Sequence, residues 1–497
     1  MRAVSLPREV KEVVAKLTKA GFEAYVVGGC VRDMFLGKEP EDWDVATSAK
    51  PEEVQKIFPD SFYENKFFTV TVRTQSTEPK LHEIEVTTYR SDFKYGDRRH
   101  PEEVQYAKTI EEDLARRDFT VNAIALRPKR DLGEPKSRLG ETEIIDLFEG
   151  RKDLKAKLIR AVGVPGARFQ EDALRMMRGV RFCATLGFSL EQKTKEAIAK
   201  NAALLKEISQ ERIRDEFTKI IMAEKAGAGI ETLRELGLLQ FIIPELVEGY
   251  GVGQNKHHIY TVWEHNLLSL EYAVKQKWSF AIRLASLLHD VGKPRVKKGE
   301  SKDSTFYGHE VMGARMAKQI LSRLKFPQKT IEKIVTLVRY HLFYYNVGEV
   351  TEASIRRLIK NVGPENTEEL LQVRMADRIG SGVPKAEPYK LRHLRYLIDK
   401  VSQDPISSSM LKVDGDDVMR ILGIESGPRI GWILDVLLAG VLEDPKKNDA
   451  SVLTQYVKEL GALPDEKLRA ISKKAEWERE TVETKRDEMT KQKYWVT

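Results

Sequence analysis

Hydrophobic residues follow two different periods along this chain, and the change comes near residue 150. Before it, apolar positions recur at the helical period from Pro7 to Gly21, and a second helical run begins at Ser48 and ends near Phe58. Short runs with strand character lie at 24–27, 68–74, 81–89 and 144–150. Beyond residue 150 the helical period continues to the end of the chain. The pattern predicts an α+β fold, with a mixed α/β head that has a small sheet and with all-helical domains after it.

At 497 residues the chain is too long for a single hydrophobic core, so several domains are expected. We place the boundaries at 1–150 for the head, 151–250 for a helical neck or body, 251–385 for a helical domain that contains histidines, and 386–497 for a helical tail. Within the tail, residues 476–493 form a helical run dense in charges of both signs. Such a run is typical of a solvated face, and contact with an RNA backbone is the alternative.

Composition narrows the class of protein. The 83 basic and 76 acidic residues give a net charge of +7, which permits an RNA partner but does not require one. The two cysteines, Cys30 and Cys183, lack the spacing of metal ligands, and so few cysteines suit a reducing cytoplasm. No apolar run approaches the roughly 18 residues of a membrane span. We therefore expect a cytoplasmic protein with no membrane partner.

The stretch 26–47 carries the densest chemistry. In strand–turn–helix–strand order it contains two glycines, an arginine and two aspartates, namely Gly28, Gly29, Arg32, Asp42 and Asp44. If the second strand opens with both aspartates, their carboxylates share one face and suit Mg²⁺ together with substrate phosphates. The glycines lack a Cβ, so backbone N–H groups there can approach a phosphate. Together these features predict a nucleoside-triphosphate site for two-metal nucleotidyl transfer. Taken singly, they would mark a tight turn and a solvated strand edge.

A third carboxylate follows in the strand-like run 81–89. Glu83, Glu85 and Thr87 share one face of that strand, which makes Glu85 a candidate beside the two aspartates. An exposed strand glutamate is the alternative. The polar and basic segment 91–101 after it is expected to be a mobile loop, and the glycine- and proline-interrupted segment 131–142 another loop.

Residues 114–123 read Leu-Ala-Arg-Arg-Asp-Phe-Thr-Val-Asn-Ala. Arg116 and Arg117 suit bidentate contacts to a triphosphate. Asp118 and Asn122 offer a carboxylate and an amide that can bind a ribose hydroxyl. The alternative is a capped helix that carries an ordinary Arg–Asp pair.

A helix is predicted over 168–187, and its spacing places Asp172 and Arg175 on one face, with Arg178 in the same candidate set. Cytosine and adenine each present an exocyclic amino donor beside a ring-nitrogen acceptor, whereas uracil and guanine present the reverse order. A carboxylate beside a guanidinium would accept the first two bases and reject the others, and Glu171 would orient Arg175. The alternative is an ordinary intrahelical salt bridge.

These strings resemble the signatures of the class II tRNA nucleotidyltransferases (the CCA-adding enzymes) and of the related bacterial poly(A) polymerases, which belong to the DNA polymerase beta superfamily. The resemblance rests on Val-Val-Gly-Gly-Cys-Val-Arg-Asp with Asp-Trp-Asp, on Arg-Arg-Asp-Phe-Thr-Val-Asn-Ala and on Glu-Asp-Ala-Leu-Arg. It implies that Asp42, Asp44 and Glu85 are catalytic and that side chains of Glu-Asp-x-x-Arg replace a template. It also implies that the segment 91–101 closes over the nucleotide and that the helix 208–221 supports the selecting helix.

A second group of histidines and aspartates lies between residues 262 and 378. Its members are His265, His289, Asp290, His309, His341 and Asp377. Imidazoles and carboxylates in a helical context suit transition-metal ions. The adjacent pair His289–Asp290 resembles the signature of the HD phosphohydrolase superfamily. This resemblance implies one metal ion on His265, His289, Asp290 and Asp377, a second completed by His309 and His341, and a metal-dependent phosphatase or phosphodiesterase activity.

The sequence thus predicts an enzyme that adds C and A nucleotides (CCA) to the 3′ end of tRNA from CTP and ATP, without a nucleic acid template. Its expected cofactors are Mg²⁺ in the head and a divalent transition metal in the HD domain. Three alternatives remain at this point. They are a poly(A) polymerase, a CC-only or A-only tRNA nucleotidyltransferase, and an RNA-binding HD phosphohydrolase whose head is inactive.

Overall fold

The computed structural model describes residues 6–64, 68–95, 101–128, 142–254, 259–300, 303–343, 345–402, 408 and 411–496. Its contacts divide the chain into two compact units. The first unit contains residues 1–341 and 372–384, and the second contains residues 342–371 and 385–497. The four domain boundaries expected from the sequence remain predictions.

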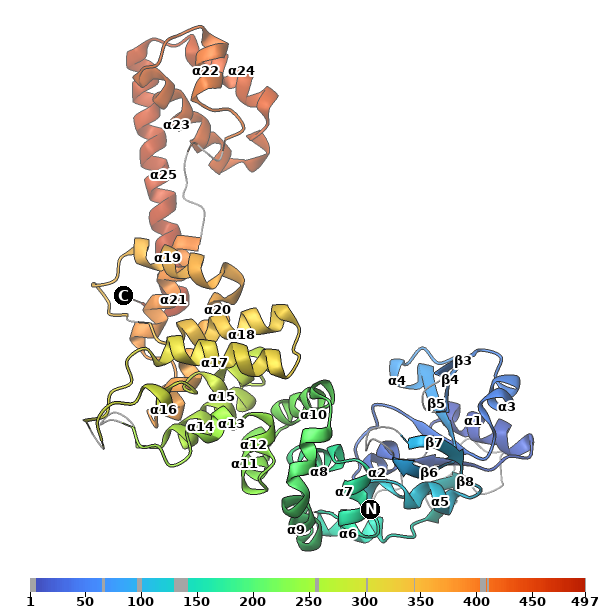
Figure 1. Cartoon of the computed structure of the whole chain (residues 1–497). Coiled ribbons are helices and arrows are strands. Elements are labelled where there is room, and N and C mark those ends of the chain that lie inside the picture. Colours follow the sequence, from blue (N-terminus) through green and yellow to red (C-terminus); the bar gives the residue numbers. More distant parts are fainter. Residues whose placement is uncertain are drawn as a thin grey trace. The chain divides into compact units, whose positions relative to one another are not determined.

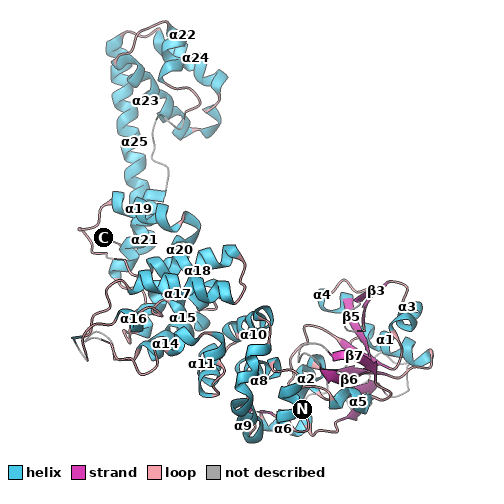
Figure 2. Cartoon of the chain, in the orientation of Figure 1, coloured by secondary structure: helices cyan, strands magenta, loops and turns pink. Residues whose placement is uncertain are grey.

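The head is built on a mixed seven-stranded sheet with the strand order β3–β4–β5–β2–β1–β8–β9. Its strands are β1 (Ala24–Val27), β2 (Asp44–Thr47), β3 (Ser61–Glu64), β4 (Thr69–Arg73), β5 (Glu83–Thr88), β8 (Ala125–Pro128) and β9 (Thr142–Ile145). β2 and β5 run parallel, and the other neighbours run antiparallel. The strands of this sheet lie in the N-terminal part of the chain, and most of the remainder is helical (Figure 2). The expected all-helical neck is wrong in one detail, because β10 (Leu158–Ile159) and β11 (Ser189–Leu190) form a short parallel pair there. The predicted α+β class is confirmed.

The side-chain pattern of two strands explains where the polar residues of the head lie. β1 is buried along its whole length, and β5 alternates between buried Ile84 and Val86 and exposed Glu83 and Glu85. In the register of the sheet, Asp44 pairs with Val27 on one side and with Glu85 on the other. The end of β1 and two carboxylates therefore meet at one place.

The helices of the head are α1 (Arg8–Lys19), α2 (Gly29–Phe35), α3 (Pro51–Ile57), α4 (Pro79–His82) and α5 (Ile110–Ala115), with a 3₁₀ turn η1 (Thr120–Asn122). The predicted first helix is confirmed, and it buries the apolar stripe that predicted it. The predicted strand 81–89 begins two residues late, because α4 takes up its first turn after Pro79.

The expected loop at 91–101 is wrong over its described residues. The chain forms β6 (Arg90–Tyr95) and β7 (Pro101–Tyr106), an antiparallel pair in which Tyr95 lies opposite Pro101. Aromatic residues such as Phe93 and Tyr95 favour strands, which the polar composition of the segment concealed. Residues 96–100 lie outside the described residues, as do 131–141 of the other predicted loop, whose last residue, Thr142, begins β9.

The neck contains α6 (Gly150–Ala156), α7 (Pro165–Glu171), α8 (Leu174–Leu186), α9 (Gln192–Asn201), α10 (Gln210–Met222), α11 (Ala226–Glu235), α12 (Leu239–Ile242) and α13 (Pro244–Val247). The single helix predicted over 168–187 is wrong, because the chain leaves the helical conformation at Asp172 between α7 and α8. The Asp172 carboxylate accepts a hydrogen bond from the Leu174 N–H, so its side chain competes with the backbone of a continuous helix.

The histidine-containing region is mainly helical, with an isolated bridge between Lys298 and Thr305. It contains α14 (Val262–Lys275), α15 (Phe280–Leu288), α16 (Lys293–Val296), α17 (His309–Arg323), α18 (Gln328–Tyr340) and α20 (Thr367–Gly380). The second unit contains α19 (Glu352–Val362), α21 (Tyr389–Ser402), α22 (Gly415–Leu422), α23 (Pro428–Glu443), α24 (Ala450–Gly461) and α25 (Asp465–Tyr494), as labelled in Figure 1. Among the described residues, no helix is long and apolar enough to cross a membrane.

Candidate nucleotide-binding and metal sites

A pocket of about 520 Å³ lies where the sheet of the head meets the neck helices α8 and α10. Most of the head and neck residues predicted from the sequence line it, namely Gly28, Gly29, Asp44, Glu85, Arg116, Arg117, Asp118, Asn122, Asp172, Arg175 and Arg178. Two predicted residues, Arg32 and Asp42, are not among its lining residues. Segments that are up to 185 residues apart in the sequence, from Val27 to Arg212, are thus gathered into one polar pocket.

The turn after β1 forms one wall of this pocket. Gly28 has φ +81°, and a Cβ there would lie 3.0 Å from Oδ2 of Asp44 and 3.2 Å from Nη1 of Arg117. Both the backbone conformation and the space therefore require glycine. The adjacent Gly29 begins α2, so backbone N–H groups at a helix N-terminus face the same pocket.

Replacing Gly28 with alanine should reduce nucleotide addition about tenfold to a hundredfold, because the new Cβ displaces Asp44 and Arg117. Gly37→Ala is the matched control, since Gly37 has φ +69° and no heavy atom within 4 Å of its Cβ position. Both variants bear the same left-handed backbone cost of about 1–2 kcal/mol. Steady-state addition rates and thermal unfolding of the two variants check this, and equal rate losses would contradict it.

The carboxylates of the head converge at the start of β2. Burial raises the pKa of Asp44 to about 6, the negative charge of Asp42 adds to the shift, and Arg117 opposes it. The expected arrangement of Asp42 is wrong, because β2 begins only at Asp44 and Asp42 lies exposed in the bend before it. The negative charge of Glu85, which pairs with Asp44 across the sheet, also raises the Asp44 pKa. Crowded carboxylates of this kind suit a divalent cation, since bound positive charge would relieve their mutual repulsion.

Two arginines stand beside these carboxylates. Arg116 and Arg117 follow α5, and both pair with a buried carboxylate, Asp113, which the sequence interpretation did not select. Nη1 of Arg117 also donates to the carbonyl oxygen of Asn122 at 3.4 Å. The two guanidinium groups are therefore fixed at the pocket wall, where they suit the oxygens of a triphosphate.

Asp118 and Asn122 lie on the next turn. Asp118 is buried and accepts a hydrogen bond from Nε of Arg178 at 2.6 Å. Burial by itself would raise the pKa of Asp118, but the charge and hydrogen bond of Arg178, with the Arg175 charge and the Phe119 N–H, together hold the pKa below its ordinary value. Arg32 donates from Nη1 to Oδ1 of Asn122 at 3.0 Å and pairs with Asp33, so it orients the amide from behind the pocket.

The predicted base-selecting residues come together despite the break in their helix. Arg175 is buried. It donates hydrogen bonds to Oε2 of Glu171 at 2.6 Å and to the backbone oxygen of Arg116 at 3.1 Å. The Asp172 carboxylate accepts a hydrogen bond from Nη2 of Arg212, on α10, at 2.7 Å. One guanidinium and one carboxylate are thus held at the pocket by separate partners and do not form a simple pair with each other.

Sequence interpretation missed several lining residues, namely Thr69, Thr87, Arg90, Leu174 and Arg212. Arg212 lies in the first turn of the supporting helix, where charged side chains are usually solvated, so nothing local marks it as a pocket residue. Thr69 and Thr87 lie opposite each other on β4 and β5, with their hydroxyl oxygens 2.9 Å apart. Their place in the pocket depends on strand pairing between distant segments, and the sequence does not specify that pairing.

The histidines and aspartates of the third region also come together. Nε2 of His265 and Nε2 of His289 lie 3.1 Å and 3.3 Å from Oδ2 of Asp290, and 3.4 Å and 3.7 Å from Oδ1 of Asp377. On the other oxygen of Asp290, Nε2 of His309 lies at 3.3 Å and Nε2 of His341 at 3.7 Å. Two candidate metal groups therefore share one bridging carboxylate.

The hydrogen bonds of these imidazoles fit metal ligands. Nδ1 of His289, His309 and His341 each lies 2.7–2.8 Å from a backbone carbonyl oxygen, which can only accept, so each Nδ1 carries a proton. A neutral ring would present an Nε2 lone pair to a metal ion. Without the ion, burial would lower the pKa of His289, but Asp290 and Asp377 outweigh it and raise the pKa to about 10. A proton on Nε2 of His289 then lies against Nε2 of His265 at 2.8 Å, in the place that a cation would take. Burial raises the pKa of Asp290, but Lys293 and His289 hold it well below its ordinary value, so the bridging group is ionised. A divalent cation would satisfy these facing acceptors.

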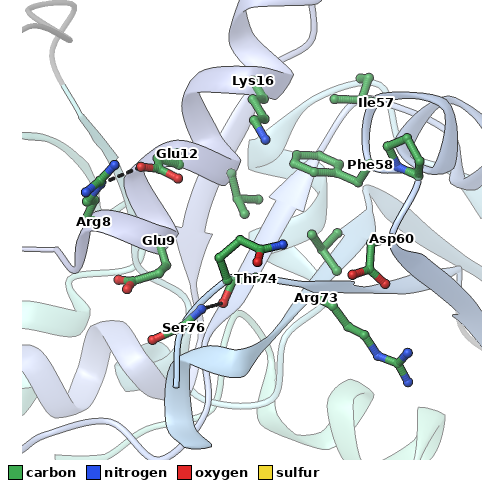
Figure 3. A pocket seen from close by; sticks show the side chains of 14 residues that line it. Arg8, Glu9, Glu12, Lys16, Ile57, Phe58, Asp60, Arg73, Thr74 and Ser76 are labelled. Atoms are coloured by element: carbon green, nitrogen blue, oxygen red, sulfur yellow. Dashed lines mark hydrogen bonds and ion pairs between the residues drawn. The ribbon is translucent and has the colours of Figure 1, made fainter. Parts of the chain in front are cut away.

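A second hollow of about 440 Å³ on the head has a different character. It lies between α1, the end of α3 and the end of β4, and Figure 3 shows Lys16 and Phe58 on one side and Thr74 and Ser76 on the other. Its charges are mixed, and Arg8 pairs with Glu12 at 2.6 Å. None of the residues predicted to carry chemistry lines this hollow.

Three family profiles match the chain in the order expected from these sites. They are "Poly A polymerase head domain" over residues 24–160, "Probable RNA and SrmB- binding site of polymerase A" over 187–249 and "HD domain" over 262–381. A CCA-adding enzyme of Lactobacillus delbrueckii is 33% identical over 92% of this chain and 99% of its own length. This chain belongs to the CCA-adding enzyme family. It is therefore a nucleotidyltransferase.

Three other CCA-adding enzymes are similar to this chain over about nine-tenths of its length. A CCA-adding enzyme of Streptococcus gordonii is 33% identical over 92% of this chain and 100% of its own. The solved Bacillus stearothermophilus CCA-adding enzyme in complex with CTP is 28% identical and covers 91% of this chain and 96% of that chain, with a TM-score of 0.56. A Thermotoga maritima CCA-adding enzyme complexed with tRNA is 18% identical with a TM-score of 0.51, which shows a shared fold.

Proposed function

We propose that this enzyme adds C and A nucleotides to the 3′ end of tRNA, with CTP and ATP as substrates and side chains in place of a template. The observation that carries the proposal is that Asp172 and Arg175 line the same pocket as the carboxylate Asp44. Such a pocket can select a nucleotide through hydrogen bonds to its base and transfer it with the help of a metal ion on Asp44. The CTP complex of the Bacillus stearothermophilus relative supports the same choice of substrate. The substrate and the free thiols of Cys30 and Cys183 suit a cytoplasmic enzyme.

In this proposal the residues of the head divide the work. Asp44 and Glu85, with Asp42 nearby, would hold Mg²⁺, which when bound would favour deprotonation of the attacking hydroxyl and offset charge on the leaving pyrophosphate. Arg116, Arg117 and the N–H groups at Gly28–Gly29 bind the triphosphate. Asp118 and Asn122 bind the ribose hydroxyls. The acceptor hydroxyl attacks the α-phosphorus as the bond to pyrophosphate breaks, and its proton passes to solvent.

Base choice in this account depends on the fixed directions of two side chains. Glu171 and the Arg116 carbonyl hold Arg175, whereas Arg212 holds Asp172. A base with its donor and acceptor in the wrong order would leave both groups unpaired at a buried place, which disfavours its incorporation.

Exchanging Arg175 for lysine should relax base choice before it weakens triphosphate binding. A charged hydrogen bond contributes about 1.5–3 kcal/mol, so incorporation of UTP relative to CTP should rise about tenfold to a hundredfold. Arg181→Lys is the matched control, because Arg181 lies on the same helix and pairs with Glu216 outside the pocket. Single-nucleotide addition with each triphosphate measures this. The base-selecting role fails if UTP use is unchanged, and the whole proposal fails if the parent enzyme extends no tRNA.

We infer a second activity for the HD region, a metal-dependent hydrolysis of phosphate esters. The two groups of buried ligands that share Asp290 favour it, since paired metal ions suit the attack of water on phosphorus. The test is hydrolysis of bis(p-nitrophenyl) phosphate and p-nitrophenyl phosphate by the full chain with Mn²⁺, Co²⁺ or Ni²⁺. Hydrolysis that persists in Asp290→Asn, or that never occurs in the metal-loaded parent, would contradict this second activity.

A further inference from the structure

One buried carboxylate holds both triphosphate-facing arginines. Asp113 lies in α5 with 1% of its surface exposed. Its Oδ1 accepts from Nε and Nη2 of Arg116 at 3.0 Å and 2.9 Å, and its Oδ2 accepts from Nε and Nη2 of Arg117 at 3.3 Å and 3.0 Å. The backbone N–H of Arg90, where β6 begins, donates to Oδ1 at 3.4 Å. A single side chain therefore anchors three residues that line the nucleotide pocket.

The bonds to Asp113 do not use Nη1 of either arginine, and Nη1 of Arg117 makes only a long bond of 3.4 Å to the Asn122 carbonyl oxygen. A guanidinium can offer two parallel N–H groups along either of two edges, and Asp113 uses the Nε–Nη2 edge of both arginines. Nη1 of Arg117 lies at the pocket wall, 3.2 Å from the Cβ position of Gly28. The backbone oxygen of Arg116 accepts from Arg175, which ties the same turn to the base-selecting side chain.

The charge of Asp113 suits this task. Burial would raise the pKa of its carboxyl, but Arg117 and Arg116 outweigh it and lower the pKa to about 2, so the group is ionised at any working pH. Two adjacent guanidinium groups repel each other, and an arginine side chain has many rotamers. A negative charge between the two guanidinium groups offsets their repulsion and restricts their rotamers before a nucleotide binds.

We propose that Asp113 is a positioning residue for the triphosphate, one that sets the directions of Arg116 and Arg117 and so serves CTP and ATP equally. The inference rests on the proposed function, since it assigns the phosphates of those substrates to these two arginines. A contact that served only the stability of the fold would not need both members of the pair to line the pocket.

The test compares Asp113→Asn with the parent in two measurements. In nucleotide addition to tRNA, the KM values for CTP and ATP should rise together by about tenfold to a hundredfold, as for loss of charged hydrogen bonds. The rate at saturating nucleotide should change less than threefold, and the preference for CTP and ATP over UTP should not change. In calorimetry with inorganic tripolyphosphate and no nucleotide, the dissociation constant should rise by the same factor.

Glu245→Gln is the matched control, because Glu245 is also buried in a two-bond pair with an arginine, Arg323, away from the pocket. It should alter thermal unfolding but neither the KM values nor tripolyphosphate binding. The inference is overturned if Asp113→Asn lowers the saturated rate without raising KM, if it changes base choice, if both variants behave alike, or if the parent does not bind tripolyphosphate. A parent that binds tripolyphosphate but adds no nucleotide would instead refute the proposed function.

Discussion

Replacing Asp44 with asparagine is expected to abolish nucleotide addition while the head stays folded. Asp44 begins β2, lies between Val27 and Glu85 in the sheet and faces the pocket. An amide cannot balance the charge of a divalent ion, and such an ion contributes several kcal/mol to the transition state. Incorporation should therefore fall about a thousandfold or more.

Although Asp44→Asn should lose activity, its metal-free form should be at least as stable as the parent. The ionised Asp44 carboxylate is partly buried and is repelled by Asp42 and Glu85, so a neutral amide removes an unfavourable interaction from the metal-free protein. The unfolding temperature in a chelator should equal or exceed that of the parent. Asp60→Asn, an exposed carboxylate of the head outside the pocket, is the control and should leave addition unchanged. Addition by Asp44→Asn above a tenth of the parent rate would contradict its role as a metal ligand.

The second large effect concerns the bridging carboxylate of the HD region. Asp290 offers Oδ2 to His265 and His289 and Oδ1 to His309 and His341. Asp290→Asn should therefore remove both metal ions, whereas His309→Gln should remove one of the two. Because metal bound only by the folded chain stabilises it, by about 4 kcal/mol at a thousandfold excess over Kd, Asp290→Asn should also lose the stabilisation that added metal gives.

Metal content per chain, measured by mass spectrometry after reconstitution with Mn²⁺ or Co²⁺ and dialysis, tests this arrangement. His82→Gln is the control, because His82 is exposed at the end of α4 and far in sequence from the cluster. Equal metal content in Asp290→Asn and the parent would refute the bridging role. Loss of a single ion in Asp290→Asn would show that the two groups are filled independently.

The parts of the fold that local sequence determines could be predicted. β1 consists of four consecutive apolar residues, α1 has a clear apolar stripe, and β5 alternates between buried and exposed positions. The glycine turn and its neighbouring acidic and basic residues formed a pattern dense enough to predict the nucleotide pocket, and all but two of its predicted residues line it.

The errors arose where a side chain or a distant segment decides the local structure. Asp172 leaves its helix because its carboxylate bonds to the Leu174 N–H and to Arg212, and helical periodicity cannot register either contact. Asp113 looked like one of three acidic residues in the first turn of a short helix. Only the fold shows that its carboxylate is buried between two arginines. The positions of Thr69 and Thr87 likewise follow from the pairing of β4 with β5.

The most direct test of the account is gel-resolved nucleotide addition by the purified full chain with Mg²⁺. Three tRNA transcripts, ending before CCA, after C and after CC, would each be given CTP, ATP, both or UTP. The account predicts that each transcript is completed to CCA with both nucleotides and then not extended further, that ATP alone extends only the transcript ending in CC, and that UTP is refused. Extension of only one class of transcript would indicate a CC-only or A-only enzyme, and an unlimited ladder with ATP would indicate a poly(A) polymerase. Either result, or no extension at all, would contradict the central claim.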